Sequence, residues 1–472
     1  MAGATGGGAS TGTLVLEGGV TLQLVGGGLY MGTDFYATTP SRTKSRTGIV
    51  SLESNSHLNL GSSTLRSDLV VGWMNTDGPG SDYSATASGL IRANTTNGGG
   101  YLSGYLNKLE VGISTGSPWR NATHAADGKI DLNGMQGALI DTRTLLVGSG
   151  LSAAATGLID LGSHAAGAFQ LIVSEEVKVG IGGPSSATGA LNADTIVSGT
   201  VTWGDNVSVR FGSQEQRVAA QIGVSSLTRS TNNAVSGAVV GTGGTFSGYF
   251  SSLVVGAQNA TAASKTYQST GVLDLRQVAV EHFSVSGNTD IGYGTGAGSK
   301  GRVYLADTEA SFGGNVRVGS SDTTNGEGLL GLKNTVAAVG GDFTIHASGS
   351  VEVIVDGSSS GIYLSEESAF TLDLGGLYSI SFSEPLNRTT PYFGLAWEGD
   401  KVSYPESLVA AGAIVWSGLE AEGIGIFYDL NTNTTYIGLD AIPEPGGAGL
   451  AIVAALTLGA IRVRNGKKGH RI

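Results

Sequence analysis

Three aspartates occupy one position of a pattern that repeats along the chain, and together they could supply paired carboxylates. Asp131, Asp160 and Asp274 each lie within three residues after a glycine that begins a copy of the pattern. Two carboxylates at a suitable separation can serve as the acid and the base in glycoside cleavage. Other copies carry unlike side chains at this position: Ser51, Arg92, Asn192 and Tyr304. This mixture favours an outward-facing polar position on an exposed strand, so we expect no catalytic residue there.

The remaining groups that could do chemistry form no pattern typical of a metal or cofactor site. The histidines are scattered, without the pair four residues apart that a zinc-binding helix presents: His57, His124, His164, His282, His346 and His470. The alternating glycines from Gly292 to Gly298 resemble a phosphate-binding loop, but no helix pattern follows them, so we expect a turn. Loop carboxylates such as Asp77, Asp82 and Asp322 are weak candidates for calcium. The chain has no cysteine. We therefore expect no cofactor, no metal and no enzymatic activity.

The elements that would position any site come from a repeat with two halves. The first half is a glycine followed by apolar residues two and four places later. It begins at Gly12, Gly48, Gly89, Gly128, Gly157, Gly189, Gly237, Gly271, Gly301 and Gly328. The second half is an apolar pair that closes on another glycine: Gly32, Gly72, Gly112, Gly148, Gly180, Gly223, Gly256, Gly292 and Gly319.

This spacing predicts stacked strands. Apolar residues two apart with polar residues between them indicate a strand with one buried face. From Gly12 to Gly32 is 20 residues, and most copies are similar; Gly189 to Gly223 is 34, which we interpret as an insertion. Constant strands joined by loops of variable length are typical of a solenoid. We expect an all-β, single-stranded parallel β-helix of about ten coils over residues 12–345, on the order of 50 Å long. A less regular third strand is expected within each coil, for example at Phe283 and Val285.

The composition limits the classes of function. Glycine makes up 78 of the 472 residues and charged residues only 14%, which fits a neutral, hydrated outer surface. Hydrophobic residues make up 40% and recur with a period of two, so the chain can bury a core. A net charge of −12 argues against nucleic acid as a partner, because phosphate binding needs clustered lysine and arginine.

The two ends of the chain differ from the repeats. Residues 1–11 have no basic start or apolar run, so we expect a disordered start whose true N-terminus is missing. Over residues 346–440 the closing glycine is lost and tryptophan and proline appear, which predicts a β-rich cap that covers the open end of the stack. A short helix is expected from Pro405 to Gly412.

The final segment, residues 441–472, has three parts in a fixed order. Pro443, Glu444 and Pro445 come first, and an uncharged stretch over residues 446–461 follows them. A basic run then closes the chain: Arg462, Arg464, Lys467, Lys468 and Arg471. The middle part predicts a transmembrane helix, although it is shorter than the usual ~20 residues. Cations after it predict that this end stays cytoplasmic.

This tail resembles the PEP-CTERM sorting signal of exported bacterial proteins. The resemblance implies that Pro443, Glu444 and Pro445 are the motif recognised by an exosortase. It also implies that residues 446–461 are a transient membrane anchor and that the basic run is a stop. Gly446-Gly447 and the long basic end depart from the usual signal. The repeats upstream are similar to autotransporter β-helix passengers.

These observations predict an exported, adhesin-like structural protein of the cell surface or the extracellular matrix of a biofilm. The partners implied are an exosortase-type enzyme, the bacterial membrane and, as a candidate, extracellular polysaccharide. Two alternatives stay open. One is a secreted carbohydrate-active β-helix enzyme, a polysaccharide lyase or hydrolase, with the same tail. The other is a protein whose tail is never cut, so that it stays anchored.

Overall fold

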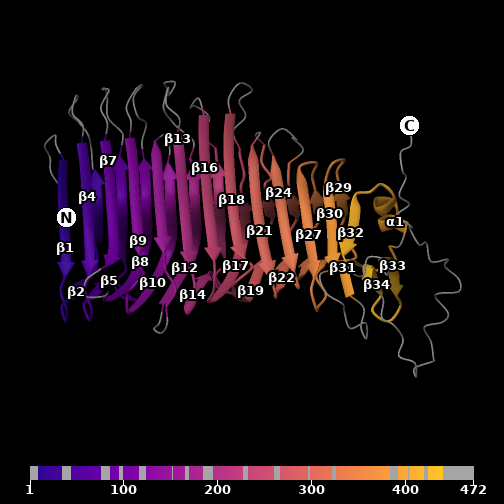
Figure 1. Ribbon diagram of the computed structural model, residues 1–472, viewed down its shortest axis with the longest axis horizontal. Coiled ribbons are helices and arrows are strands. Elements are labelled where there is room, and N and C mark those ends of the chain that lie inside the picture. The colour runs from indigo at the N-terminus through magenta and orange to yellow at the C-terminus, as the bar shows by residue number, and fades with distance from the viewer. Residues whose placement is uncertain are drawn as a thin grey trace.

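A computed structural model describes most of the chain. The described ranges are 9–34, 44–75, 85–94, 99–115, 124–150, 153–164, 169–183, 195–226, 232–259, 266–295, 298–320, 326–382, 392–401, 403–418 and 424–439. The protein is all-β, as expected, and its strands stack side by side into an elongated body (Figure 1). The N-terminal strand lies at one end of this body and the C-terminal elements lie at the other.

One long sheet, sheet A, runs the length of the body and contains thirteen strands. In spatial order these are β1 (Ala9–Leu16), β4 (Lys44–Leu52), β7 (Ala85–Ala93), β9 (His124–Asp131), β11 (Ala154–Asp160), β13 (Thr195–Trp203), β16 (Asn232–Gly241), β18 (Thr266–Leu275), β21 (Ser299–Ala306), β24 (Glu327–Lys333), β27 (Gly349–Val355), β30 (Leu377–Phe382) and β32 (Ile414–Gly418). Neighbouring strands are parallel throughout, and their glycines align, for example Gly48 with Gly89 and Gly89 with Gly128.

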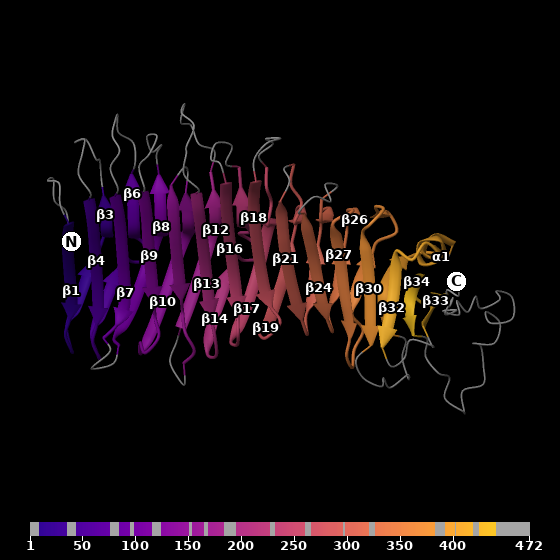
Figure 2. The same ribbon diagram turned by 45° about the horizontal axis from the view of Figure 1, so that its top comes forward.

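The chain leaves each sheet A strand and passes through a second sheet, sheet B, before it returns (Figure 2). The first pass uses β2 (Thr21–Leu24), β5 (His57–Leu60), β14 (Val207–Phe211), β19 (Ala279–Val285), β22 (Glu309–Phe312), β25 (Val336–Val339), β28 (Gly361–Leu364) and β31 (Tyr392–Glu398). The second pass uses β3 (Gly28–Asp34), β6 (Ser67–Asn75), β15 (Val218–Ser225), β20 (Thr289–Ile291), β23 (Val316–Val318), β26 (Phe343–Ile345) and β29 (Phe370–Leu372).

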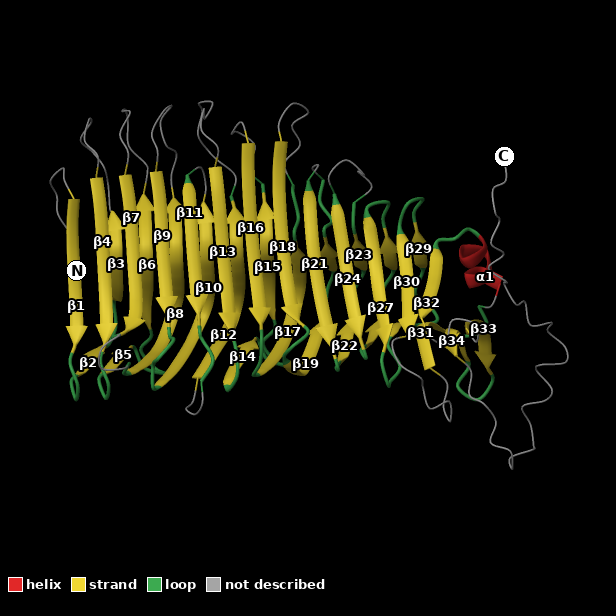
Figure 3. Ribbon diagram, viewed as in Figure 1, coloured by secondary structure: helices red, strands yellow, loops and turns green. Residues whose placement is uncertain are grey.

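Four strands run through both passes: β8 (Tyr101–Thr115), β10 (Gly137–Gly150), β12 (Phe169–Gly182) and β17 (Thr245–Val255). A register shift marks the corner between the two passes, as at Thr142 and Thr144 of β10. The first pass is the expected third strand, and β19 contains Phe283 and Val285 as predicted. Long parallel sheets visited in this order are compatible with a β-solenoid (Figure 3).

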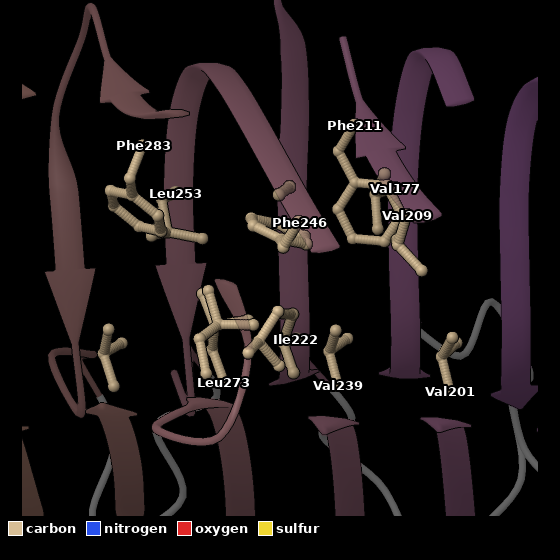
Figure 4. Close-up of a cluster of buried hydrophobic side chains, with 14 of the residues drawn as sticks. Val177, Val201, Val209, Phe211, Ile222, Val239, Phe246, Leu253, Leu273 and Phe283 are labelled. Carbon is tan, nitrogen blue, oxygen red and sulfur yellow. The ribbon is translucent and has the colours of Figure 1, made fainter. Parts of the chain in front are cut away.

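The interior is lined by apolar ladders that continue from strand to strand. One register position of sheet A forms an unbroken inner row: Leu14, Val50, Ile91, Ile130, Ile159, Val201, Val239, Leu273, Val303, Leu330, Val351, Tyr378 and Ile414. Figure 4 shows Val201, Val239 and Leu273 in this row, with Phe211 and Phe246 of sheet B beside them. These side chains are almost fully buried, which supplies the main driving force for stacking.

The two glycines of the repeat meet at a seam where sheets A and B touch backbone to backbone. The closing glycine has a left-handed conformation, as at Gly72 with φ of 68°. The sheet A glycine lies against it without room for a side chain: a Cβ on Gly89 would lie 2.5 Å from the Gly72 nitrogen. A left-handed conformation and contact between backbones both exclude a side chain, which explains why glycine recurs at these two offsets.

The sixth copy of the repeat was misplaced by the sequence prediction. Gly199 of β13, not Gly189, aligns with Gly157 and Gly237. Gly189 lies outside the described residues. From Gly199 to Gly223 is 24 residues, within the range of the other copies, so the 34-residue spacing inside the repeat disappears. The extra length precedes the strand, between β12 and β13.

The parallel ladders continue past residue 345, where the sequence prediction began a cap. β27, β30 and β32 extend sheet A in parallel register. Antiparallel pairing begins only at the end, where β34 (Thr434–Leu439) pairs with β31 and with β33 (Ile424–Asp429). The expected short helix is confirmed as α1 (Ser403–Ala410), which packs Leu408 and Val409 against the core. Within the described part of the chain, no helix is long and apolar enough to cross a membrane.

Candidate functional site

Many charges on the outer faces pair with neighbours on the same or an adjacent strand. The ion pairs of this kind include Lys108–Glu110, Lys129–Asp131, Lys178–Glu176, Arg276–Asp274, Arg302–Glu327, Arg317–Asp290 and Lys333–Asp356. Exposed pairs of this type contribute little stability each, and they balance only part of the charge, because the chain as a whole is at −12. A functional site is therefore expected where this pairing is incomplete or where the surface is hollowed.

Two of the three aspartates with a common repeat position are neighbours. Asp131 and Asp160 face each other across β9 and β11, and the Asn133 side-chain amide donates hydrogen bonds to both, at 2.9 and 2.7 Å. Burial favours the neutral form of Asp131, but hydrogen bonds from Lys129 and Asn133 outweigh it and hold the pKa of Asp131 below its ordinary value. A carboxylate kept ionised in this way is poorly suited to donate a proton.

Asp274 does not join this pair. The ladder position of Asp160 continues through Thr202 and Val240 before it reaches Asp274, so two strands separate the carboxylates. Asp274 instead accepts hydrogen bonds from Arg276, whose Nε lies 3.0 Å from Oδ1 of Asp274. The three aspartates therefore do not converge, and the interpretation of this position as an outward-facing polar one agrees with their partners.

The histidines with described side chains lie apart from one another and take structural partners. His57 stacks on Tyr101 of the adjacent strand with ring centroids 4.6 Å apart. His164 lies 2.6 Å from the Leu161 carbonyl oxygen, and the His282 ring lies 5.3 Å from that of Tyr249. In the described ranges no group of three or more His, Asp or Glu side chains could hold a metal ion.

His346 belongs to a row of side chains on the outside of the second pass. Its Nδ1 lies 2.8 Å from Asp373, and its ring stacks on Tyr293 at 5.1 Å. The Arg317 guanidinium also lies over the Tyr293 ring, 4.0 Å from the ring centroid. Its Nε pairs with the Asp290 carboxylate at 2.6 Å. Each charge has a partner and each ring has a neighbour, so the row ties successive strands together.

The glycine-rich segment after β20 is a corner of the fold. Gly292 is the closing glycine of its copy, with φ of 64°. The chain then enters β21 and not a helix, so the backbone nitrogens that a phosphate loop presents at a helix start are not provided here. The described residues of this segment, 292–295 and 298, contain no helix, which agrees with the expected turn.

The surface is hollowed at the corner between the two passes of sheet B, beside β10 and β12. At two places a loop of the same design separates the passes: residues 61–66 and residues 212–217. Both begin with Gly-Ser and end with Arg, and Ser62 and Ser213 accept matching hydrogen bonds from Leu65 and Gln216, each at 3.0 Å. Between these loops β8, β10 and β12 turn the corner without an insertion.

The arginine that ends each loop fixes it to strands further along the stack. Arg66 donates to the carbonyl oxygens of Leu106 and Asp141, each at 3.0 Å, and to the Asp141 carboxylate at 2.9 Å. Arg217 likewise donates to Phe250, at 3.4 Å, and to the Ser284 hydroxyl, at 2.8 Å. The sequence prediction missed this repeated Gly-Ser-x-x-x-Arg, although it is visible in the printed sequence.

The two loops are the walls of a depression of about 370 Å³, which we name the corner groove. Its lining consists of Ser63, Arg66, Asp141, Arg143, Ile172, Val173, Ser174, Glu175, Arg210, Gly212, Ser213 and Gln216. The lining carries three arginines against two carboxylates. This local excess of positive charge lies on a chain whose net charge is −12.

One groove arginine is not neutralised. Arg66 pairs with Asp141 at 2.9 Å, and Arg143 lies 3.6 Å from Glu175. Arg210 is exposed and has no ion-pair partner among the residues that the structure describes. On one side its ladder neighbour is Ile172, which separates it from Asp141. On the other side its ladder neighbour is Ser247, whose hydroxyl donates a hydrogen bond to the Glu281 carboxylate at 3.0 Å. The corner groove can therefore offer a free guanidinium to an anion.

The residues singled out in the tail lie outside the described part of the chain: Pro443, Glu444, Pro445, Arg462, Arg464, Lys467 and Lys468. The same holds for Asp77, Asp82, Asp322 and His470. No protein family model, no curated protein and no solved structure matches this chain. Function is therefore inferred from this chain's own sequence and structure.

Proposed function

We propose that this protein is a non-enzymatic, adhesin-like structural component of the bacterial cell surface or extracellular matrix. Its body is a single-stranded parallel β-helix in which one sheet A strand and two sheet B passes form each coil. The observation that carries the proposal is the unbroken inner row from Leu14 to Ile414. Such a body is a stiff support that presents loops at regular intervals.

The proposed route to the surface depends on the C-terminal tail. Pro443, Glu444 and Pro445 are recognised by an exosortase-type enzyme, and residues 446–461 hold the chain in the inner membrane until it is processed. Arg462, Arg464, Lys467 and Lys468 keep the end in the cytoplasm. The finished protein is then released to the envelope or to the matrix.

Alanine substitution of Pro443, Glu444 and Pro445 tests this route. The variant should accumulate in the inner-membrane fraction, while the wild type reaches the outer fractions. The control replaces Glu384 and Pro385, a second Glu-Pro pair, and should leave the distribution unchanged. An unchanged distribution of the tail variant contradicts the sorting role. Mass spectrometry of surface protein that still ends at Ile472 would favour permanent anchoring.

The rival activity, a carbohydrate-active enzyme, has one observation in its favour, the neighbouring carboxylates of Asp131 and Asp160. Incubation of the purified protein with a panel of acidic and neutral polysaccharides decides between the structural function and the enzyme. Our proposal expects no new reducing ends and no unsaturated products. Turnover that is lost in Asp131→Asn or Asp160→Asn would establish the enzyme instead.

A further inference from the structure

The corner groove is a built feature of the fold and not an accident of loop packing. Two loops of the same design stand on either side of strands that carry no insertion. Arg66 anchors the first loop to the strands between them, and Arg217 anchors the second loop to β17 and β19 on its other side. The floor comes from the corners of β10 and β12, whose backbones are fixed by pairing on both sides. Walls and floor are therefore held in place before any ligand arrives, which reduces the entropic cost of binding.

The chemistry of the lining selects a polar, anionic ligand. Hydroxyl and amide groups of Ser63, Ser213 and Gln216 supply donors and acceptors for sugar hydroxyls. The guanidinium of Arg210 is exposed and unpaired in the described chain, and the 3.6 Å contact of Arg143 with Glu175 is loose. Arginine presents a planar fork that matches a carboxylate with two parallel hydrogen bonds.

We propose that the corner groove binds a carboxylated glycan, a segment of polyuronic acid, with Arg210 as the principal carboxylate contact and Arg143 as the second. This inference deepens the proposed function and rests on it, because it names the matrix component that the surface protein holds. Arg66 is a positioning residue, since its guanidinium already bonds to Leu106 and Asp141. A matrix polymer offers many equal segments, so weak single contacts add up across many copies of the protein.

A long, highly charged polyanion such as nucleic acid fits the molecule less well. The groove has an excess of only one positive charge, and the chain as a whole is at −12. Phosphate-backbone binding needs several neutralised phosphates in a row. A glycan with carboxylates spaced between neutral hydroxyl groups matches one free guanidinium set among serine and glutamine side chains.

The experiment measures binding of the full chain to polygalacturonate oligomers by calorimetry at low and high salt. Arg210→Gln should weaken binding about tenfold or more, because the variant loses the positive charge and the two parallel hydrogen bonds to the carboxylate. The affinity of Arg210→Lys should lie between those of Arg210→Gln and the wild type, because lysine keeps the charge but lacks the planar fork of arginine. Arg92→Gln removes an exposed arginine of sheet A that also lacks an ion-pair partner within the described ranges, and should change nothing.

Equal affinity of Arg210→Gln and the wild type would overturn the proposal, as would no binding at low salt. Equal or tighter binding of a neutral dextran oligomer or of single-stranded DNA would overturn the choice of ligand. Unfolding curves that coincide for all variants confirm that folding is not the cause. If the wild type reaches the surface normally but does not bind the oligomer, only this inference is refuted. If the protein cleaves the oligomer, the non-enzymatic function is refuted, while the binding site remains.

Discussion

Gly89 of β7 lies directly against Gly72 of β6, and a Cβ on Gly89 would come within 2.5 Å of the Gly72 nitrogen and 2.9 Å of the Met31 carbonyl oxygen. Both obstacles are backbone atoms, so no side-chain rotation can relieve the overlap. Gly89 itself has no left-handed φ, so the requirement for glycine there is one of space alone. The same contact recurs in successive copies, for example between Gly48 and Gly32.

Gly89→Ala should therefore lower the free energy of unfolding by about 3 kcal/mol, at the upper end of the usual cost of overpacking. The matched control is Gly104→Ala, also inside a strand, where the nearest atoms that a Cβ would meet belong to the Leu106 side chain, at 3.3 Å or more. The control should cost less than about 1 kcal/mol. Urea titration of both variants makes the comparison, and equal costs would contradict the backbone seam.

The core aromatic side chains should account for much of the packing energy near the middle of the stack. Phe246 is fully buried and lies between Trp203 and Phe211, with ring centroids at 5.9 and 5.5 Å. Phe246→Ala should cost ~3–5 kcal/mol through the lost transfer energy and the cavity. Ile196→Ala is the control, because Ile196 is 59% exposed and should cost no more than ~0.5 kcal/mol. A Phe246 variant with wild-type stability would show that the interior is not packed as described.

The ion pair between Lys129 and Asp131 makes stability depend on pH. Because the folded-state pKa of Asp131 is lowered, its contribution is fully present above the unfolded value of about 3.9 and is lost as pH falls through the folded value. Asp131→Asn should therefore be less stable than the wild type near neutral pH, by under about 1 kcal/mol since the pair is partly exposed.

The measurement is the free energy of unfolding of both proteins from neutral pH down to about pH 2. The difference between them should close below about pH 4. In a Lys129→Gln background the same substitution should have a smaller effect at every pH. A difference that widens on acidification would have the opposite sign to that expected for a lowered pKa of Asp131, and would contradict the stabilising role of its ionised form.

Arg217 should hold its corner loop in place. Arg217→Met keeps the length of the side chain but removes the hydrogen bonds to Phe250 and Ser284, which should cost ~1–3 kcal/mol. Amide exchange of residues 212–217 should accelerate, because the loop loses its attachment. Arg92→Met, which removes an exposed arginine, should change neither quantity. Unchanged exchange in the Arg217 variant would show that the loop is fixed by other contacts.

The stacked strands could be predicted because each copy of the repeat carries its own signal. Apolar residues two apart indicate the buried face, and the glycines mark the seam, so the inner row followed from spacing alone from Leu14 to Ile159 and from Val239 to Val303. The error at Gly189 has a physical cause. The segment Gly189-Ala-Leu191-Asn-Ala193 has the right period, but only pairing with β11 and β16 distinguishes it from Gly199-Thr-Val201.

The corner groove could not be predicted in the same way. Successive arginines of the groove, Arg66, Arg143 and Arg210, are about seventy residues apart in sequence. They lie in one groove only because the different coils that carry them are stacked. Their proximity depends on the lengths of the intervening loops, which the repeat does not fix. The sequence also did not show where the parallel ladder ends. The strands from β27 to β32 keep the period of two, but this region lacks the closing glycine that marked earlier copies.

The most direct test of the stack is the distance between spin labels on one outer row of sheet A. The chain has no cysteine, so labels can be placed at will. Arg92, Tyr304 and Glu352 share one register position, with Tyr304 six strands and Glu352 eight strands from Arg92. At ~4.8 Å per strand, pulsed dipolar spectroscopy should give separations of about 29 Å for Arg92→Cys with Tyr304→Cys and about 38 Å for Arg92→Cys with Glu352→Cys. Two separations that do not increase with the number of strands between the labels would contradict the parallel stack.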